Sequence, residues 1–444
     1  MSTSNFVYKT YQIGNDQQTV SFDYTSVHDG NNYNFTEVIQ FPQPLLDTPS
    51  IHNALQSLHL ALGISYYKIF VNQTINHPYY MDAAKAGFWN NVFLNGLGEF
   101  LYVNRLHHDR LAKFTPQNGT PTFDVEPTDQ YQERAMMGIG GGKDSILAGE
   151  LLKSINLPID GFVMATGNQL GQAQDVAKVM GVDLLAIKRT LDQSLLTVQE
   201  TAGAYKGHVP ISLIFGLVGC VLAINQKAKY VVVANESSAS IPRVIWQDND
   251  INHQWSKSFE FEQLFQDYTH QYINQNVTYF SAIRPLSSIA IVKQFAKYKP
   301  YLPVFTSDNS VFKINSADRP HNRWSLNSPK SLSSFILLSP WLTEEELITT
   351  FERNFMDEAS LEDLLYELIG HKGHQPLDCV GTEEELLLSI SLAYQQGKLQ
   401  RTYLMQKLVD KHLVRVSEDV KHSTPLAIML RPSPEHAIPT EIYS

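Results

Sequence analysis

Apolar and polar side chains alternate along the first 45 residues, in runs that are separated by turn-forming residues. This alternation predicts β-strands. Residues 51–62 and 93–102 instead carry apolar side chains at the spacing of a helix. We therefore predict an α+β N-terminal domain over residues 1–130, with a linker near the Pro- and Gly-containing run at 116–121.

The pattern of apolar and polar residues changes near residue 134, where short apolar runs begin to alternate with helical patterns. Strands are expected at 134–139, 161–165, 183–187 and 230–234, with helices from 146 to about 154 and at 170–180 and 211–226. Apolar strands that alternate with helices form a doubly wound parallel sheet of the α/β class. We predict such a domain over residues 131–341 and a helical C-terminal region over 342–444, where capped helix starts recur.

Polar clusters follow three of the predicted strands, at residues 140–145, 166–168 and 235–238. Ligands of doubly wound sheets bind beyond the carboxyl ends of the strands. We therefore expect these clusters to lie along one rim of the sheet and to form a binding site.

The first cluster belongs to a glycine-rich turn between a predicted strand and a predicted helix, which reads Gly-Ile-Gly-Gly-Gly-Lys-Asp-Ser over residues 138–145. This arrangement is typical of phosphate binding, because glycines admit the anion to the backbone and the helix start presents free N–H groups. Asp144 after Lys143 excludes a Walker A loop, and Lys143 stands where the dinucleotide fingerprint needs a glycine. A glycine turn without a ligand is the alternative.

The same turn resembles the pyrophosphate loop (PP-loop) of the ATP pyrophosphatases, Ser-Gly-Gly-x-Asp-Ser, with a glycine in the place of the first serine. The resemblance implies the fold of that superfamily and the cleavage of ATP to AMP and pyrophosphate. The expected ATP-binding residues are Gly140, Gly141, Gly142, Lys143, Asp144 and Ser145. Mg²⁺ is expected with ATP, since it neutralises polyphosphate oxygens using few protein carboxylates.

Two further polar clusters contain candidate site residues. Asn235, Glu236 and Ser238 follow a predicted buried strand and are candidates for substrate or metal contact, although a bare loop would have the same composition. His253 and Lys257 carry groups suited to anion binding and acid–base chemistry, or else to a solvated helix face.

Arg284 and Cys379 are the remaining candidates. Arg284 lies in a short basic turn, where its guanidinium suits a bidentate grip on a carboxylate or phosphate; a plain surface turn is the alternative. Cys379 precedes a capped helix, a place where a thiol pKa can be depressed, although most cysteines are small buried apolar residues.

Composition narrows the class of protein. A formal net charge of −11 argues against nucleic acid as a general partner. Cys220 and Cys379 are the two cysteines, which is no disulfide framework and suits the cytoplasm. The start has no signal-peptide pattern.

Residues 209–225 are uncharged, but Pro, Ser and Asn interrupt them and they fall short of the ~20 apolar residues of a membrane span. We expect a buried helix there and no membrane partner; oligomeric state is not predicted.

The candidate motifs recur together and in order in a known family. They lie at residues 140–145, 235–238, 252–260, 284–287 and 378–382. The set resembles the UDP-N-acetylmuramoyl-L-alanyl-L-glutamate epimerases, and further likeness at 62–68 and 96–102 extends over nearly the whole chain.

The resemblance implies an activity. The family uses ATP to invert the terminal L-glutamate of a UDP-N-acetylmuramoyl dipeptide to D-glutamate through an acyl adenylate, with release of AMP and pyrophosphate in peptidoglycan precursor synthesis. The implied catalytic residues are Asp144, His253, Lys257 and Cys379, and the implied substrate-binding residues are Asn235, Glu236, Ser238 and Arg284. The proton-transfer base is left open among them.

Two alternatives stay open at this point. One is another adenylating ligase or amidotransferase that uses the same loop on a different carboxylate or on tRNA, although the acidic charge disfavours tRNA. The other is a nucleotide-binding module without catalysis. Asp144, Ser145 and the other polar clusters disfavour that module.

The chain departs from the family at one set of positions. The family carries four cysteines, spaced for a structural zinc or thiolate cluster, where this chain has Asp308, Ser325, Ser328 and Ser331. Three serines and an aspartate do not bind zinc in that way. We expect no metal cluster, and a loop held by packing and hydrogen bonds instead.

Overall fold

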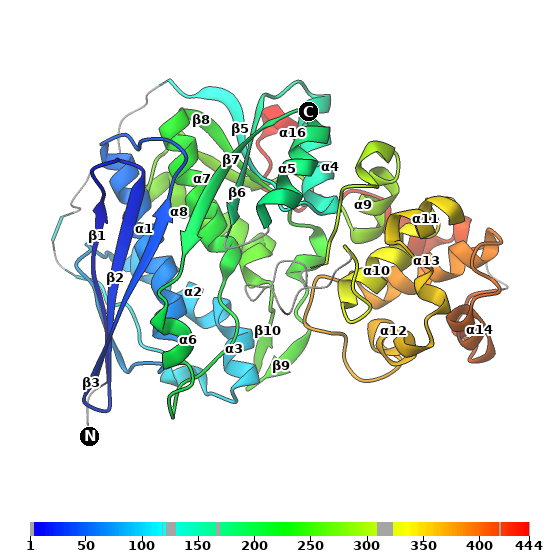
Figure 1. The fold of residues 1–444 in the computed structure, drawn as a ribbon, viewed down its shortest axis with the longest axis horizontal. Coiled ribbons are helices and arrows are strands. Elements are labelled where there is room, and N and C mark those ends of the chain that lie inside the picture. Colours follow the sequence, from blue (N-terminus) through cyan, green and yellow to red (C-terminus); the bar gives the residue numbers. More distant parts are fainter. Residues whose placement is uncertain are drawn as a thin grey trace.

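The computed structural model describes residues 4–117, 119–120, 130–165, 169–308, 323–416 and 419–443. Within them, nine strands form one mixed sheet in the order β11-β8-β5-β6-β7-β3-β2-β1-β4 (Figure 1). The strands are β1 (Asn5–Ile13), β2 (Thr19–His28), β3 (Asn31–Gln40), β4 (Thr74–Asn76), β5 (Gln132–Gly138), β6 (Ile159–Ala165), β7 (Asp183–Thr190), β8 (Ala228–Val233) and β11 (Thr278–Ser281).

Strands β5, β6, β7, β8 and β11 are paired in parallel, in agreement with the sequence prediction. The chain moves outward from β5 through β6 to β7, and then returns across β5 to β8 and β11. The direction of winding therefore reverses between β5 and β8. In open α/β sheets this reversal is the place where a ligand crevice forms.

Helices cover both faces of the parallel strands, which confirms the predicted α/β architecture (Figure 1). On one face lie α1 (Pro49–Tyr67), α7 (Ile211–Gln226) and α8 (Phe259–Tyr272), and on the other lie α4 (Lys143–Ser154), α5 (Gln169–Met180) and α9 (Ser288–Phe295). Met136 of β5 packs in the first core, while Ala135 and Met137 pack in the second. Neighbouring residues of β5 pack in different cores because successive side chains of a strand point to opposite faces of the sheet.

Helix α7 is the apolar segment that the sequence placed inside the protein. Cys220, in its middle, is fully buried, and α7 packs against α1 and β5. Across the described ranges of the chain, no helix combines the length and apolar character needed to cross a membrane.

The N-terminal strands extend the same sheet instead of forming a second one. Strand β3 pairs antiparallel with β7, so that Ile39 lies opposite Arg189. Beside this pairing the Arg189 Nε atom lies 2.5 Å from Glu37 Oε1, and both side chains are buried. The N-terminal strands and the parallel strands thus share one sheet and one core, and the domain boundary near residue 130 stays a prediction.

Further elements surround the rim at the carboxyl ends of the parallel strands (Figure 1). They are α2 (Ala83–Gly96), α3 (Gly98–Val103), α6 (Ser194–Val198) and the hairpin of β9 (Val244–Trp246) and β10 (Asn249–Ile251). The helix predicted at 93–102 is divided between α2 and α3, because Leu97 has a non-helical backbone conformation and caps both.

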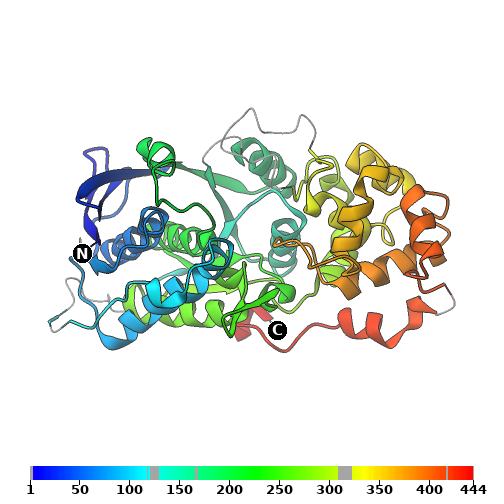
Figure 2. The same cartoon turned by 90° about the horizontal axis from the view of Figure 1, so that it is seen from below.

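The C-terminal region is helical, as predicted, and lies beside the sheet (Figure 2). Its helices are α10 (Pro329–Leu338), α11 (Glu344–Phe351), α12 (Glu362–Leu368), α13 (Glu383–Gln395), α14 (Tyr403–Asp410), α15 (Thr424–Met429) and α16 (Thr440–Tyr443). Capping boxes start α11, at Thr343 and Glu346, and α13, at Thr382 and Glu385.

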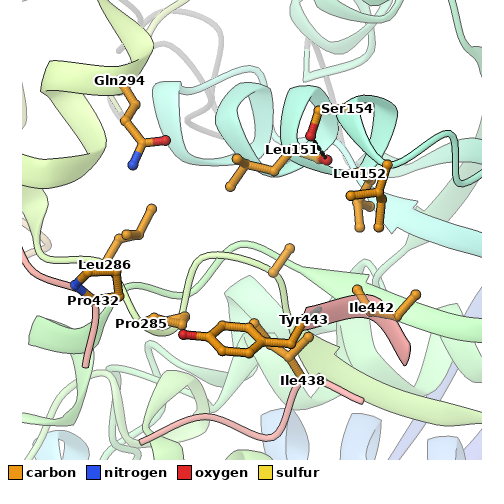
Figure 3. A pocket seen from close by; sticks show the side chains of 12 residues that line it. Leu151, Leu152, Ser154, Pro285, Leu286, Gln294, Pro432, Ile438, Ile442 and Tyr443 are labelled. Carbon is orange, nitrogen blue, oxygen red and sulfur yellow. Dashed lines mark hydrogen bonds between the residues drawn. The ribbon is translucent and has the colours of Figure 1, made fainter. Parts of the chain in front are cut away.

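The end of the chain returns to the sheet. Ile442 and Tyr443 of α16 line, with Leu151 and Leu152 of α4, a small and mostly apolar cavity of about 240 Å³ (Figure 3). No residue of the glycine-rich turn lines this cavity.

Candidate active site

A cavity of about 620 Å³ opens where the winding of the sheet reverses. Its lining includes Gly138 at the end of β5, Met164 of β6, Val233 of β8 and Asn235 just beyond β8. The sequence predicted a site on this rim, and two of the three polar clusters expected there, at 140–145 and 235–238, contribute residues to the cavity. The third, at 166–168, lies outside the described residues.

The backbone of the glycine-rich turn depends on its glycines. Gly141 has a φ of +85°, in the left-handed region, and a Cβ there would lie 2.5 Å from Cγ of Gln172. A Cβ on Gly140 would meet nothing within 4 Å. Gly142 caps α4 and carries no side chain, so the start of the helix faces the cavity through backbone atoms. This is the geometry that accepts a phosphate group.

Lys143 and Asp144 form an ion pair at the start of α4. Lys143 Nζ lies 2.6 Å from Asp144 Oδ1; Lys143 is buried, and Asp144 lines the cavity. Burial lowers the pKa of Lys143, but the negative charges of Asp144 and Glu236 outweigh it and hold that pKa above its usual value. Ser145 also lines the cavity, and its hydroxyl donates to the Gly142 carbonyl oxygen at 3.1 Å.

A second loop, at 304–308, packs against the glycine-rich turn, and the sequence did not predict this contact. The Thr306 N–H donates to the Gly141 carbonyl oxygen at 3.1 Å, and Ser307 lines the cavity beside it. Gln172 Nε2 donates to the Val304 carbonyl oxygen. The loop therefore holds one edge of the glycine-rich turn in place.

Asp308 ends that loop and is fully buried. Its Oδ2 accepts hydrogen bonds from the Ser325 N–H at 2.7 Å and from the Ser331 hydroxyl at 2.9 Å. Ser328 caps α10, one turn before Ser331. Asp308, Ser325, Ser328 and Ser331, the positions at which the sequence resemblance implies cysteines, are thus brought together, and hydrogen bonds to the Asp308 carboxylate join three of them.

The residues after β8 have two different positions. Asn235 lines the cavity, and the Ser281 hydroxyl fixes it through bonds of 2.8 Å to its backbone N–H and carbonyl oxygen. Glu236 and Ser238 are buried outside the lining, and the Glu236 carboxylate accepts from the hydroxyls of Ser238 and Ser288, each at 2.6 Å. Both side chains thus make contacts within the wall of the cavity, and their contact with substrate stays a prediction.

Arg284 is also within the wall and does not line the cavity. Its Nε donates to Glu262 Oε2 at 2.8 Å, and both side chains are 1% exposed. Its other two nitrogens donate to the backbone carbonyl oxygens of Glu236 and Lys257, at 2.8 and 2.6 Å. A buried guanidinium needs such partners, so Arg284 joins two loops of the site. Its direct grip on substrate stays a prediction.

Lys257 and Cys379 meet in the cavity. Lys257 Nζ lies 3.5 Å from Cys379 Sγ, and the thiol donates to Gln254 Oε1. The Cys379 N–H is bonded to Asp378 Oδ1 at 2.8 Å. All four residues line the cavity, so the structure brings together two of the predicted catalytic residues.

His253 is the third predicted catalytic residue in the cavity wall. It is 7% exposed, and neither ring nitrogen has a hydrogen-bond partner among the described residues. Burial lowers the pKa of His253 to about 3, which keeps the ring neutral near pH 7. Buried polar atoms are normally bonded, so the free nitrogens leave a donor and an acceptor for a ligand.

Four charged or polar residues of the cavity were not singled out from the sequence. Lys330 Nζ lies 3.4 Å from Asp378 Oδ1, and His208 Nδ1 lies 3.3 Å from Glu99 Oε2. All four line the cavity. Glu99 and Asp378 lie in the segments 96–102 and 378–382 that resemble the family, but no local pattern predicts either pair, because the partners are far apart in sequence.

The cavity therefore combines the glycine-rich turn with two lysines, Lys257 and Lys330, and a thiol, while a third lysine, Lys143, is buried at the turn. Lys143 and Asp144 stand at the turn. Lys257 lies 3.5 Å from the Cys379 sulfur, and Lys330 pairs with Asp378, the residue before Cys379. Such a site can hold a polyanion at one end and move a proton at the other.

Comparison with known proteins agrees with the resemblance seen in the sequence. The family model of the MurL N-terminal domain matches residues 1–282, and that of the MurL C-terminal domain matches residues 304–423. The chain is 30% identical to the UDP-N-acetyl-alpha-D-muramoyl-L-alanyl-L-glutamate epimerase of a Micromonospora strain, over 98% of this chain and 96% of that protein.

Two further proteins of the same name are similar to this chain. The one from Salinispora tropica is 31% identical over 91% of this chain and 88% of its own length. The one from Xanthomonas oryzae pv. oryzae is 31% identical over 89% and 85%. Both family models and these matches confirm the predicted kinship, and the chain belongs to the MurL family.

Proposed function

We propose that this chain is an ATP-dependent epimerase, which inverts the terminal L-glutamate of UDP-N-acetylmuramoyl-L-alanyl-L-glutamate in cytoplasmic synthesis of peptidoglycan precursors. The names of three relatives that match most of its length support the reaction. The observation that carries the proposal is one cavity that joins the glycine-rich turn to Cys379, Lys257 and His253.

ATP has a chemical purpose in this reaction. A carboxylate activates its α-proton poorly because it already carries negative charge. Attack of the carboxylate on the α-phosphorus of ATP would displace pyrophosphate and give an acyl adenylate. Its carbonyl can accept the charge of an enolate, and water later releases AMP. We assign the polyphosphate to the backbone of 140–142 and to Lys143, in the manner of a PP-loop enzyme, and Mg²⁺ to Asp144.

Proton transfer belongs at the other end of the cavity. Cys379 is our candidate for one proton-transfer group, because the Lys257 ammonium 3.5 Å away can stabilise charge that develops on the sulfur. His253 presents a neutral ring with free nitrogens, and it can donate a hydrogen bond to the carbonyl oxygen as the enolate forms.

The buried polar residues have a supporting role in this proposal. Arg284 ties the backbone at Lys257 to the backbone at Glu236, and so keeps the Lys257 loop against the segment that follows β8. Asn235 is the residue of this group that can contact substrate, because it lines the cavity.

One assay tests the function. The protein is incubated with ATP, Mg²⁺ and UDP-N-acetylmuramoyl-L-alanyl-L-glutamate, and AMP release and the chirality of the glutamate are followed. We expect D-glutamate and AMP with the intact protein, and neither product with Asp144→Ala. Absence of D-glutamate would contradict the proposal, and AMP formed only with another acid would favour an adenylating ligase or amidotransferase.

A further inference from the structure

A pair of titratable side chains in the cavity has no role in the reaction described so far. Glu99 lies in the first turn of α3, and His208 lies in the segment before α7. The carboxylate Oε2 and the imidazole Nδ1 are 3.3 Å apart, both side chains are about three-quarters buried, and both residues line the cavity.

The surroundings of Glu99 favour exchange of a proton near neutral pH. Burial and the negative charge of Asp378 raise the pKa of Glu99 to about 7, while Lys68 acts in the opposite direction. Burial, followed by the positive charges of Lys68 and Lys257, lowers the pKa of His208 to about 4. The neutral imidazole can donate to the Glu99 carboxylate or accept from its protonated form.

Inversion of a carbon centre by this route needs a proton transfer at each of its two faces. A proton leaves one face of the α-carbon, and a proton must arrive on the other. Cys379 enters the cavity from the loop that precedes α13, whereas Glu99 enters it from α3, on the N-terminal side of the sheet. The chain thus supplies acid–base groups to one cavity from two unrelated segments.

We infer that Glu99, positioned by His208, is a second proton-transfer group, which serves the face of the α-carbon opposite to Cys379. The inference rests on the proposed epimerase function. It goes beyond that function by naming Glu99 as the second proton-transfer group and His208 as the residue that orients it.

The proton balance is simple. The Cα–H bond breaks, the proton passes to one of the two groups, and the electron pair moves into the activated glutamyl carbonyl. The pair then returns to the α-carbon, which takes a proton from the other group on the opposite face. One group ends protonated and the other deprotonated, and exchange with water restores both.

Exchange in D₂O separates this arrangement from a structural role. The α-hydrogen of the L-glutamyl substrate is followed by mass spectrometry, and inversion by chiral analysis, for Glu99→Gln and Cys379→Ser. We expect one variant to exchange the α-hydrogen without inverting the α-carbon. The other variant should lose both exchange and inversion. Inversion should fall by about 10²- to 10⁴-fold in each. Glu345→Gln, an exposed glutamate of α11, is the matched control and should behave as the intact protein does.

Two further variants address folding and positioning. Glu99→Asp keeps the carboxylate and should recover part of the inversion that Glu99→Gln loses. His208→Asn should shift the pH profile of α-hydrogen exchange, because it removes the partner of the carboxylate. Substrate binding, measured calorimetrically, should change little in Glu99→Gln.

Near-normal inversion by Glu99→Gln would overturn the inference. Loss of both exchange and inversion in both variants, with binding intact, would overturn it as well. If the intact protein forms no D-glutamate, the proposed function itself fails, and this outcome is distinct because it is read without any variant.

Discussion

The Cys379 sulfur lies 3.5 Å from Lys257 Nζ, although 122 residues separate the two in the chain. Cys379 belongs to the loop that leads into α13 of the C-terminal region, and Lys257 stands just before α8 of the sheet domain. The active cavity is therefore complete only when the helical region is packed on the sheet. This relationship makes Cys379 a direct probe of the site.

Alkylation should distinguish the two cysteines. Cys379 is partly exposed at the cavity, whereas Cys220 is fully buried and burial raises the pKa of its thiol to about 12. Iodoacetamide should therefore modify Cys379 alone and abolish inversion. Mass spectrometry of the digested protein gives the modified position, and Cys379→Ala is the unlabelled control. Inactivation of the protein without modification of Cys379 would contradict its place in the site.

Two neighbouring glycines offer a matched pair of substitutions. Gly141→Ala places a side chain at a φ of +85° and displaces Gln172, so it should cost about 1–2 kcal/mol or more of stability. Gly140→Ala meets open space and should leave the melting temperature unchanged. Both should weaken ATP binding, because the added methyl groups lie where we place the phosphates. A stable Gly140→Ala protein with normal ATP affinity would exclude the turn as the nucleotide site.

Arg284 should behave as a structural residue. Arg284→Ala leaves the Glu262 carboxylate buried without its charge partner, which costs about 3–5 kcal/mol. Denaturant unfolding should show this loss directly. A second variant, Arg284→Met combined with Glu262→Met, removes both charges and should recover part of the stability. If Arg284→Ala were as stable as the intact protein but bound substrate weakly, the direct contact predicted from the sequence would be correct.

Asp308 should hold the loop that packs on the glycine-rich turn. Asp308→Ala leaves the Ser325 N–H and the Ser331 hydroxyl without their acceptor, at a cost of about 1–3 kcal/mol for each buried group. The KM for ATP should rise as well, because Thr306 loses its fixed position beside Gly141. Melting temperature and ATP kinetics measure both effects. Asn327→Ala, at an exposed neighbouring position, is the control, and an equal effect of both variants would contradict this role.

The sequence by itself determined the features that depend on near neighbours. The strand, the glycine-rich turn and α4 follow from an apolar run, from glycines that tolerate unusual backbone angles, and from a helix start within some twenty residues. The capping boxes at Thr343 and Thr382 are equally local, because a cap bonds to the backbone three residues away. The order of strands and helices also placed two polar clusters on one rim.

Only the tertiary structure decided which side chains meet. Pairing of β3 with β7 joins the N-terminal strands to the main sheet, and no local pattern encodes a pairing of segments that lie 150 residues apart. The same packing turns Arg284 into the wall and brings Glu99 to His208 in the cavity. Side-chain partners depend on topology and burial, since a charged group finds its partner where the fold removes it from water. The sequence shows which polar and charged residues are candidates for the site. Which of them meet one another depends on how distant segments pack together.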